Sequence, residues 1–171
     1  MKIQFGCGKT EFGSVFLALH KKQICKISFS ENKKETLKEL KVVFFTGEFE
    51  EKSATWVRSQ WKKLNSKQMS KIELKKQVKN FAHGTTFQKN VWFALLDIPF
   101  GETTSYSEIA KKIGSPKAVR AVGSAVGANP FGYLIPCHRV LPKSGGLGGF
   151  AWGVKLKKTM LEHEQKARST K

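Results

Sequence analysis

Residues 105–140 read SYSEIAKKIGSPKAVRAVGSAVGANPFGYLIPCHRV, and they set the architecture of the second half of the chain. The first part of this stretch predicts two short helices joined by a Gly-Ser-Pro turn. Ser105 is the expected N-cap of the first helix, and Glu108 completes a capping box. Ser115 and Pro116 fit the cap and the first position of the second helix. Two helices joined in this way have helix-turn-helix form, which suits DNA binding or simple packing.

The second of these helices has two contrasting faces. Val119, Val122 and Val126 share one side and are predicted to point inward. Apart from two cations, the opposite side carries only small residues: Lys117, Arg120, Ala121, Ser124, Gly127 and Ala128. A helix that reads bases would carry several long polar side chains. The small face instead permits close approach to a groove, with Arg120 as its one central long side chain, and it would equally suit packing against another helix.

The end of the stretch places a thiol beside an imidazole, in the motif IPCHRV of residues 135–140. A free cysteine has a pKa of about 8.5 and is only a few per cent thiolate at neutral pH. A nearby base and a nearby cation both raise that fraction. Cys137, His138 and Arg139 offer these three residue types, so the motif predicts a nucleophilic cysteine.

A helix predicted over residues 153–168 adds a candidate partner for the imidazole. Its buried side is defined by Leu156, Met160 and Leu161. Glu164 lies in the same sector, where a carboxylate is costly unless it is paired. Two interpretations stay open: Glu164 pairs with an imidazole, or it reaches solvent at the helix end.

The first half of the chain predicts a mixed arrangement of strands and helices. Alternating apolar residues around a turn at residues 21–23 predict a β-hairpin over 13–29. Periodicity predicts the remaining elements: helices over 31–45, 53–65 and 86–98, and a strand over Ile72–Val78. The turn-rich segment NFAHGTT, residues 80–86, is the predicted boundary between two domains.

Composition excludes several classes of protein. The chain has 171 residues, of which 40% are hydrophobic, so it can bury a core without disulfides. Three irregularly spaced cysteines argue against a disulfide framework. No apolar run approaches the ~18 residues of a membrane span. Lys9 and Glu11 interrupt the N-terminal segment, which argues against a signal peptide. We therefore expect an intracellular, reducing compartment and no membrane partner.

The net charge of +18 concerns binding partners rather than fold. Nucleic acid is the partner class that such a charge favours. The charge comes mostly from lysines spread over both halves, so it does not locate a binding face. A lysine-rich proteome would produce the same composition.

Residues 86–164 as a whole resemble the O6-alkylguanine-DNA alkyltransferases, which repair DNA by direct reversal. The similarity is almost unbroken, is centred on PCHRV, and is closest to the bacterial form, including the C-terminal domain of the adaptive-response protein. Residues 1–80 are similar only loosely. The resemblance implies an α+β fold: a ribonuclease H-like α/β domain with an antiparallel sheet over 1–82, and a mainly helical alkyltransferase domain with a winged helix-turn-helix-like motif over 83–171.

The resemblance also implies a function. Members of the family flip an alkylated guanine out of duplex DNA and transfer the alkyl group irreversibly to a cysteine. The implied protein is a monomeric, single-turnover methylated-DNA–protein-cysteine methyltransferase of the bacterial cytoplasm, associated with the nucleoid through DNA. Its implied substrates are O6-methylguanine and O4-methylthymine in double-stranded DNA, and no cofactor is expected.

Catalytic roles follow by position in the family motif. Cys137 resembles the alkyl acceptor, and His138 resembles the base that acts through a water. Glu164 resembles the carboxylate that orients the imidazole, as in a triad. Asn129 resembles the asparagine that braces the turn carrying the cysteine. Tyr106 resembles the tyrosine that rotates the phosphate and donates to the guanine ring.

Binding roles follow in the same way. Arg120 resembles the arginine that enters the base stack and fills the place of the flipped base, whose extrusion costs a few kcal/mol. The other implied DNA contacts are Ser105, Tyr106, Lys117, Ala121, Ser124 and Arg139. The implied substrate pocket is lined by Pro136, Val140, Phe150, Ala151 and Trp152.

Three departures from the family pattern qualify these assignments. Phe150 and Ala151 stand where some members have a tyrosine and a serine. Gly132 and Trp152 replace a proline and a small residue found in members that accept bulky alkyl groups, so we expect poor reaction with free O6-benzylguanine. A zinc site of some members would require Cys7, His20, Cys25 and His83, but His20 and Cys25 come in swapped order, so no metal is expected.

The sequence leaves three alternative functions open. One is a lesion-binding relative without transfer activity, which would lack the cysteine. Another is a cysteine hydrolase built on Cys137 and His138, which would need an oxyanion hole and turnover. The last is a helix-turn-helix regulator, for which the second helix lacks base-reading side chains.

Overall fold

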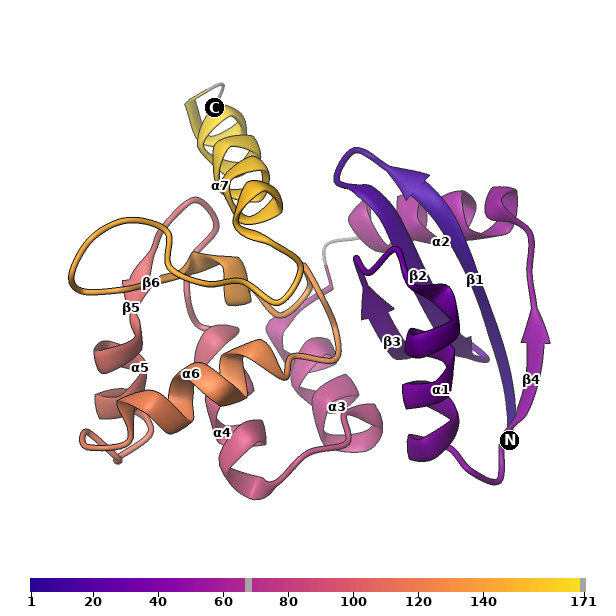
Figure 1. The fold of residues 1–171 in the computed structure, drawn as a ribbon, viewed down its shortest axis with the longest axis horizontal. Coiled ribbons are helices and arrows are strands. Elements are labelled where there is room, and N and C mark those ends of the chain that lie inside the picture. The colour runs from indigo at the N-terminus through magenta and orange to yellow at the C-terminus, as the bar shows by residue number, and fades with distance from the viewer. Residues whose placement is uncertain (67–68, 170–171) are drawn as a thin grey trace. The chain divides into compact units, whose positions relative to one another are not determined.

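The structure, a computed structural model, describes residues 1–66 and 69–169. The chain forms two compact units (Figure 1). Unit 1 consists of Met1–His83 and Pro130–Gly132; unit 2 consists of Gly84–Asn129 and Tyr133–Lys171. The assignment of a ribonuclease H-like domain to 1–82 and an alkyltransferase domain to 83–171 stays a prediction.

Unit 1 is built on a four-stranded sheet. Its strands are β1 Lys2–Thr10, β2 Gly13–His20, β3 Gln23–Ser28 and β4 Glu48–Glu51. The strand order is β3-β2-β1-β4, antiparallel except for β4, which runs parallel to β1. The predicted hairpin over residues 13–29 is confirmed as β2 and β3, and residues 130–132 add a short parallel bridge to β3 through Ile27.

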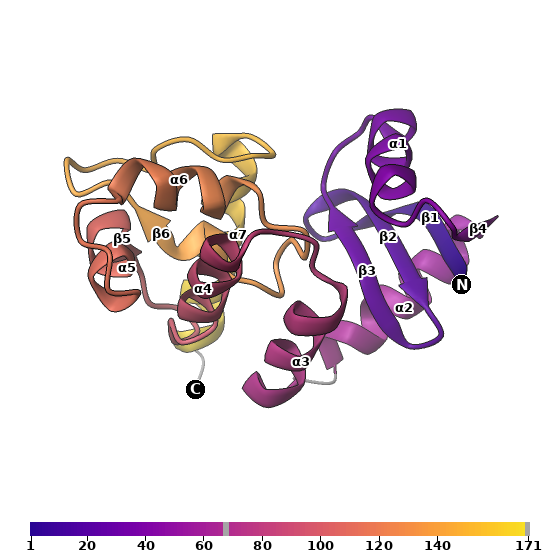
Figure 2. The ribbon, with the colours of Figure 1, turned by 90° about the horizontal axis from the view of Figure 1, so that it is seen from below.

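Helices cover both faces of this sheet (Figure 2). They are α1 Lys33–Val43, α2 Ala54–Ser66 and α3 Lys71–Phe81, of which α1 and α2 confirm predicted helices. On the α1 side the core consists of Ile3, Phe5, Phe16, Ala18, Cys25, Leu40 and Phe44. On the other face α2 packs against Gly6 and Gly8, where an added β-carbon would lie 2.9 and 3.0 Å from Val57. Because these glycines weaken the strand pattern, β1 was not predicted.

The strand predicted over Ile72–Val78 is wrong, because these residues belong to helix α3. Ser70 and Glu73 form a reciprocal capping box at its start. Ile72, taken as a strand residue, is 81% exposed, whereas Val78 is fully buried. The buried residues of α3 are the neighbours Gln77 and Val78, which would point to opposite faces of a strand, so burial does not follow the alternation that a strand requires.

Unit 2 is mainly helical. Its elements are α4 Thr86–Leu95, β5 Thr104–Ser105, α5 Tyr106–Lys112, α6 Val119–Gly127, the 3₁₀ turn η1 Cys137–Arg139, β6 Val140–Leu141 and α7 Val154–Ser169. The two short strands pair in parallel. Trp92 of α4 is fully buried and donates its indole N–H to the Ala125 carbonyl at 2.8 Å, which fastens α4 to α6. This buried contact in unit 2 therefore fixes the position of α6 relative to α4.

The start of α6 differs from the prediction. Ser115 and Pro116 do not begin the helix; Ala118 is the N-cap, without a side-chain hydrogen bond. The Ala118 amide donates to the Ser115 carbonyl at 2.9 Å, so these residues form a separate turn. As a result Val119 lies at the helix end and is 37% exposed, whereas Val122 and Val126 are buried as expected.

The cap of α5 is formed in part. Ser105 Oγ accepts a hydrogen bond from the Glu108 amide at 3.2 Å, as predicted. The Glu108 carboxylate pairs with Lys111 at 3.0 Å instead of reaching back to the cap. Gly114 follows the helix with φ of +73°, a conformation that favours glycine.

The predicted fold class is confirmed as a mixed fold, with a largely antiparallel sheet and a mainly helical second part. Within the described ranges, none of the helices has the length and apolar character needed to cross a membrane.

Candidate active site

Cys137 lies at the start of the turn η1, with Pro136 as its N-cap residue. Its side chain is buried, and its amide donates to the Ile135 carbonyl at 2.7 Å. Asn129, just beyond the end of α6, donates from Nδ2 to the same carbonyl at 2.9 Å and to Cys137 Sγ at 3.1 Å. One buried amide therefore fixes both the turn and the sulfur, which is the arrangement predicted for Asn129.

Burial controls the acidity of this thiol. Desolvation raises the pKa of Cys137 to about 11, although hydrogen bonds from Asn129 and the turn amides and the charge of Lys157 oppose the increase. The resting site therefore holds a neutral thiol at pH 7. A proton acceptor is needed before the sulfur becomes a strong nucleophile.

His138 is fully buried beside this thiol in the chain and contacts the final helix. Its Nε2 lies 2.8 Å from Glu164 Oε1. An ionised carboxylate accepts only, so Nε2 carries the proton and Nδ1 keeps its lone pair. Among the described residues, none makes a hydrogen bond to the buried Nδ1. Burial lowers the pKa of His138 in spite of Glu164, so the ring is neutral at pH 7 and can accept a proton.

Glu164 is 1% exposed, which rules out the interpretation in which it reaches solvent. Besides His138, its carboxylate accepts hydrogen bonds from Arg139 Nε and Nη2 at 2.9 Å each, and from the Gly101 amide at 2.9 Å. Burial works against ionisation, but the hydrogen bonds from His138 and Arg139 outweigh it and lower the pKa of Glu164 to about 2. Gly101 has φ of +75°, which favours glycine at this position.

Arg139 is oriented toward the same carboxylate. Its side chain is 12% exposed, and Nη1 donates to the Ile98 carbonyl at 2.7 Å. The guanidinium lies 5.5 Å from the centre of the Phe100 ring. Arg139 thus neutralises Glu164, and its predicted contact with DNA stays a prediction.

A pocket of about 180 Å³ opens over the sulfur. Its lining consists of Tyr106, Gly123, Val126, Gly127, Cys137, Gly149, Phe150 and Ala151. Three residues predicted for the pocket, Pro136, Val140 and Trp152, are not part of this lining. Trp152 instead packs edge-on against Phe150, with ring centres 5.3 Å apart, so it contacts a residue that lines the pocket without lining the pocket itself.

Tyr106, the first residue of α5, forms one side of the pocket. Its ring lies 4.0 Å from the position that a β-carbon would take on Gly123. Burial raises the pKa of Tyr106, and the nearby Cys137 raises it further. The phenol therefore remains protonated at pH 7 and can act as a hydrogen-bond donor toward a bound group.

The sequence left two interpretations of the small face of α6 open, and its exposure argues against packing on another helix of the described chain. Every residue assigned to that face is exposed: Lys117, Arg120, Ala121, Ser124, Gly127 and Ala128. Since Gly127 also lines the pocket, this face reaches the mouth of the site. Ser105, also predicted to contact DNA, uses its hydroxyl as the α5 cap.

Residues 86–166 match the DNA-binding domain of 6-O-methylguanine DNA methyltransferases. The inducible methylated-DNA–protein-cysteine methyltransferase of Bacillus subtilis is 52% identical over 86 residues, covering 50% of this chain and 48% of that protein. The chain spans about half the length of the curated relatives it matches.

Solved structures extend the similarity to almost the whole chain. Mycobacterium tuberculosis OGT in complex with DNA is 34% identical, with a TM-score of 0.68, covering 95% of this chain and 93% of that one. A crystal structure of the O6-methylguanine methyltransferase from the same organism is 30% identical, with a TM-score of 0.68, covering 96% of this chain and 93% of that one.

The chain belongs to the O6-alkylguanine-DNA alkyltransferase family.

Two residues around the pocket and the imidazole were not predicted from the sequence. Tyr133 has φ of +69°, unusual for a non-glycine residue, and its ring stacks on His138 at 5.9 Å with an interplanar angle of 7°. Lys157 is fully buried in α7. Its spacing from Met160 and Glu164 places it on the buried face, a signal that was present in the sequence.

The four residues considered for zinc are not brought together. His20 Nδ1 lies 2.7 Å from the Lys2 carbonyl oxygen, and His83 packs against Phe44. Over residues 1–66 and 69–169, the structure contains no group of three or more His, Cys, Asp or Glu residues suited to a metal ion.

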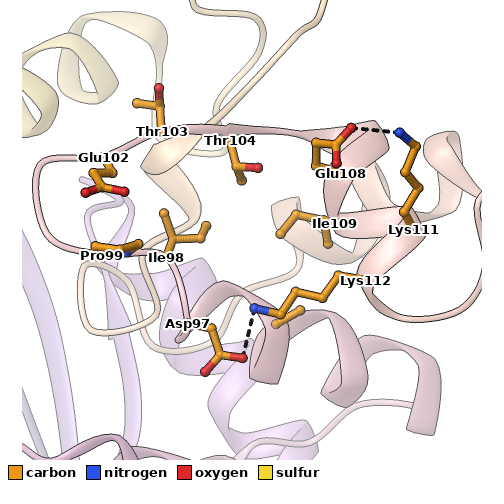
Figure 3. A pocket seen from close by; sticks show the side chains of 11 residues that line it. Asp97, Ile98, Pro99, Glu102, Thr103, Thr104, Glu108, Ile109, Lys111 and Lys112 are labelled. Atoms are coloured by element: carbon orange, nitrogen blue, oxygen red, sulfur yellow. Dashed lines mark hydrogen bonds and ion pairs between the residues drawn. The ribbon is translucent and has the colours of Figure 1, made fainter.

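A larger pocket, of about 550 Å³, lies along α5 but does not include Cys137 (Figure 3). Its walls carry paired charges: Lys112 with Asp97 at 3.0 Å and Lys111 with Glu108 at 3.0 Å. Because these charges satisfy one another, the larger pocket offers a charged ligand little. Of these two pockets, the smaller one is lined by Cys137 and Tyr106.

Proposed function

We propose that the protein is a single-use DNA repair alkyltransferase, which moves the alkyl group of O6-alkylguanine in duplex DNA to Cys137. The observation that carries the proposal is a buried thiol lining a pocket, held by Asn129 and followed by a neutral imidazole that is paired with Glu164. Family membership and the DNA complex of the Mycobacterium tuberculosis relative support duplex DNA as the partner.

The proposed transfer is a single displacement. Cys137 Sγ forms a bond to the alkyl carbon as the bond between that carbon and guanine O6 breaks. The thiol proton passes through solvent to His138 Nδ1, and Glu164 stabilises the imidazolium that results. The electron pair of the broken bond leaves on the guanine. Since no step removes the thioether, each molecule reacts once.

Tyr106 is proposed as the donor to the leaving guanine. Its hydroxyl stays protonated because burial raises the pKa of Tyr106. A hydrogen bond donated by the hydroxyl to the guanine ring stabilises the negative charge that develops as the bond breaks, and the proton stays on Tyr106. Ala151 has no hydroxyl, so the other side of the pocket offers backbone amides to the alkylated oxygen.

Base flipping is proposed to deliver the lesion. The small residues on the exposed face of α6 allow close approach to a groove, and the exposed Arg120 is proposed to fill the gap in the stack. Extrusion of a base costs a few kcal/mol, which a stacked guanidinium offsets in part. O6-methylguanine is the proposed main substrate and O4-methylthymine a second one. The protein is proposed to act as a monomer.

The test is to incubate the protein with a duplex that contains O6-methylguanine and to weigh the intact protein. We expect a gain of one methyl group per molecule, located on Cys137 by peptide mapping. The Cys137→Ser variant is expected to bind the duplex but gain no methyl. Methylation at Cys7 or Cys25, or binding without transfer by the wild type, would contradict the proposal. Sustained turnover would select a cysteine hydrolase.

Pocket size is proposed to limit the alkyl group. Trp152 packs against Phe150, which lines the pocket, so the indole limits how far this wall can move to admit a benzyl ring. We expect slow inactivation of the wild type by free O6-benzylguanine and faster inactivation of Trp152→Gly, measured as loss of methyl transfer after preincubation. Rapid inactivation of the wild type, or an unchanged rate in the variant, would refute the steric argument.

A further inference from the structure

Lys157 is a buried cation to which the proposed reaction assigns no role. Its side chain is fully inaccessible to solvent in the middle of α7. Removing an ammonium group from water costs several kcal/mol even after the surroundings relax. Among the ion pairs of the described residues, none joins Lys157 to a carboxylate. The cost must therefore be offset by other contacts.

Backbone carbonyls supply those contacts. Lys157 Nζ donates to the Val140 carbonyl at 2.7 Å and to the Leu147 carbonyl at 2.6 Å, and it lies 3.5 Å from the Gly149 carbonyl. An ammonium group has three protons to donate, so these three oxygens account for all of them. Each acceptor is a fixed point of the chain rather than a mobile side chain.

The three carbonyls belong to two separate segments of the site. Val140 directly follows the turn that carries Cys137. Leu147 and Gly149 belong to residues 142–153, here called the pocket loop. Gly149 and its two successors, Phe150 and Ala151, line the pocket over the sulfur. A single ammonium group thus connects the nucleophile's turn to the pocket wall.

The pocket loop needs such a connection because it is locally weak. It has no helix or strand of its own, and four of its glycines adopt positive φ: Gly145, Gly146, Gly148 and Gly153. Glycine loses more conformational entropy on ordering than any other residue. The ammonium also lies 5.9 Å from the centre of the Phe150 ring, which adds a favourable contact to the wall itself.

We propose that Lys157 is a positioning residue, which sets the distance between Cys137 and the pocket loop and so holds the pocket at the width needed for a flipped base. The effect of this role on a flipped base rests on the proposed function, but the connection between the two segments can be tested without DNA. The charge of Lys157 would also assist the transfer, because a nearby cation stabilises the thiolate that develops on Cys137. The other polar or charged groups around the thiol are Asn129, Tyr106 and His138, with Glu164 and Arg139 behind the imidazole.

The first experiment compares Lys157→Met with Lys158→Met. Both variants remove one cation from α7, but Lys158 is exposed and makes only a 3.8 Å ion pair with Glu162. Hydrogen exchange followed by mass spectrometry is expected to show faster exchange in residues 142–153 of Lys157→Met only. Unchanged exchange there, or the same increase in Lys158→Met, would overturn the proposal. This measurement uses no DNA and stands even if the proposed function fails.

The second experiment separates positioning from folding. In Lys157→Met we expect transfer from duplex O6-methylguanine to slow by up to about 100-fold, the scale of a ~1 Å misplacement. Alkylation of Cys137 by iodoacetamide, which needs no shaped pocket, is expected to persist, with its pH midpoint moved upward. Equal losses in both reactions would indicate a merely structural role and contradict the proposal.

A conservative variant covers the case in which Lys157→Met does not fold. Lys157→Arg keeps the charge and the donors, so it is expected to retain more loop protection and more transfer than Lys157→Gln, which keeps only the donors. Equal behaviour of the two variants, or better protection of residues 142–153 in Lys157→Gln than in Lys157→Arg, would contradict the proposal, because the tie is assigned to a charged donor.

Discussion

The two units of the molecule treat polar groups in opposite ways. Within the described residues, the buried polar side chains of unit 1 are uncharged: Ser28, Thr36 and Gln77. Its charges form surface pairs such as Lys26 with Glu39. Unit 2 instead buries His138, Lys157 and Glu164 almost completely.

This difference indicates where function resides. Buried charges cost folding free energy even when they are paired, so a sequence that retains several of them in one place must use them. Unit 1 has an apolar core formed by its sheet and helices. Unit 2 devotes part of its core to a pocket with titratable groups.

The largest effect on stability is expected for Glu164→Gln. The change leaves Arg139 buried with a neutral partner, and breaking a buried pair costs about 3–5 kcal/mol. Urea unfolding measures this loss. Glu162→Gln on the same helix is the control, since Glu162 makes only an exposed contact with Lys158. Equal stability of the two variants would break the contrast between buried and exposed charge.

The carboxylate also predicts an acid limb. The pKa of Glu164 is lowered to about 2 in the folded state, against about 4.3 in an unfolded chain. Its contribution is therefore complete above that unfolded value and is lost as the pH falls toward 2. Glu164→Gln is expected to lose this part of the acid dependence.

Arg120→Ala sharpens the comparison from the functional side, because Arg120 is charged and exposed. We expect little change in stability but a duplex repair rate lower by one to two orders of magnitude, since a few kcal/mol of flipping cost is no longer offset. Transfer from a free-base substrate should change much less. Single-turnover kinetics on both substrates measure the ratio, and equal losses would assign Arg120 to the chemistry or the fold.

A smaller effect is expected from His138 between pH 5 and 7. Burial lowers the pKa of His138 in the folded state, so the unfolded chain binds the additional proton below about pH 6.5. Stability is therefore expected to fall as the pH drops through this range, with a slope of at most about 1.4 kcal/mol per pH unit. His138→Gln should flatten the slope in urea titrations. A slope unchanged in the variant would mean that other groups produce it.

The smallest effect is expected in unit 1. Lys26→Met removes the exposed pair with Glu39 (3.1 Å) and should cost about 0.2–1 kcal/mol, decreasing further with salt. Thermal unfolding at low and high salt checks this. A loss as large as that of Glu164→Gln would show that unit 1 also depends on its charges.

The sequence predicted most elements for local reasons. Caps and apolar spacing located the hairpin and helices α1, α2, α4, α5 and α7, because these signals act within a few residues. The same local signals misled where two patterns competed. The apolar residues of 72–78 led to the wrong prediction of a strand, and Pro116 led to the wrong prediction of a helix start.

The residues of the candidate site also divide into those with a local signal in the sequence and those without one. The motif around Cys137 identified His138 directly, and the buried sector of the last helix pointed to Glu164. Tyr133 and Gly101 carried no such signal, since their importance arises from a ring stack and from an amide donated across 63 residues of sequence.

By itself, the amino-acid sequence determined the fold class, the small-residue face of α6 and the presence of a thiol, an imidazole and a carboxylate. Only the tertiary structure decided how these groups behave. It buried Cys137 so that its pKa rises to about 11, kept His138 neutral and placed the ammonium of Lys157 between two segments. The reason is physical: spacing along the chain is a local property, whereas desolvation and electrostatic pairing depend on everything that surrounds a group in space.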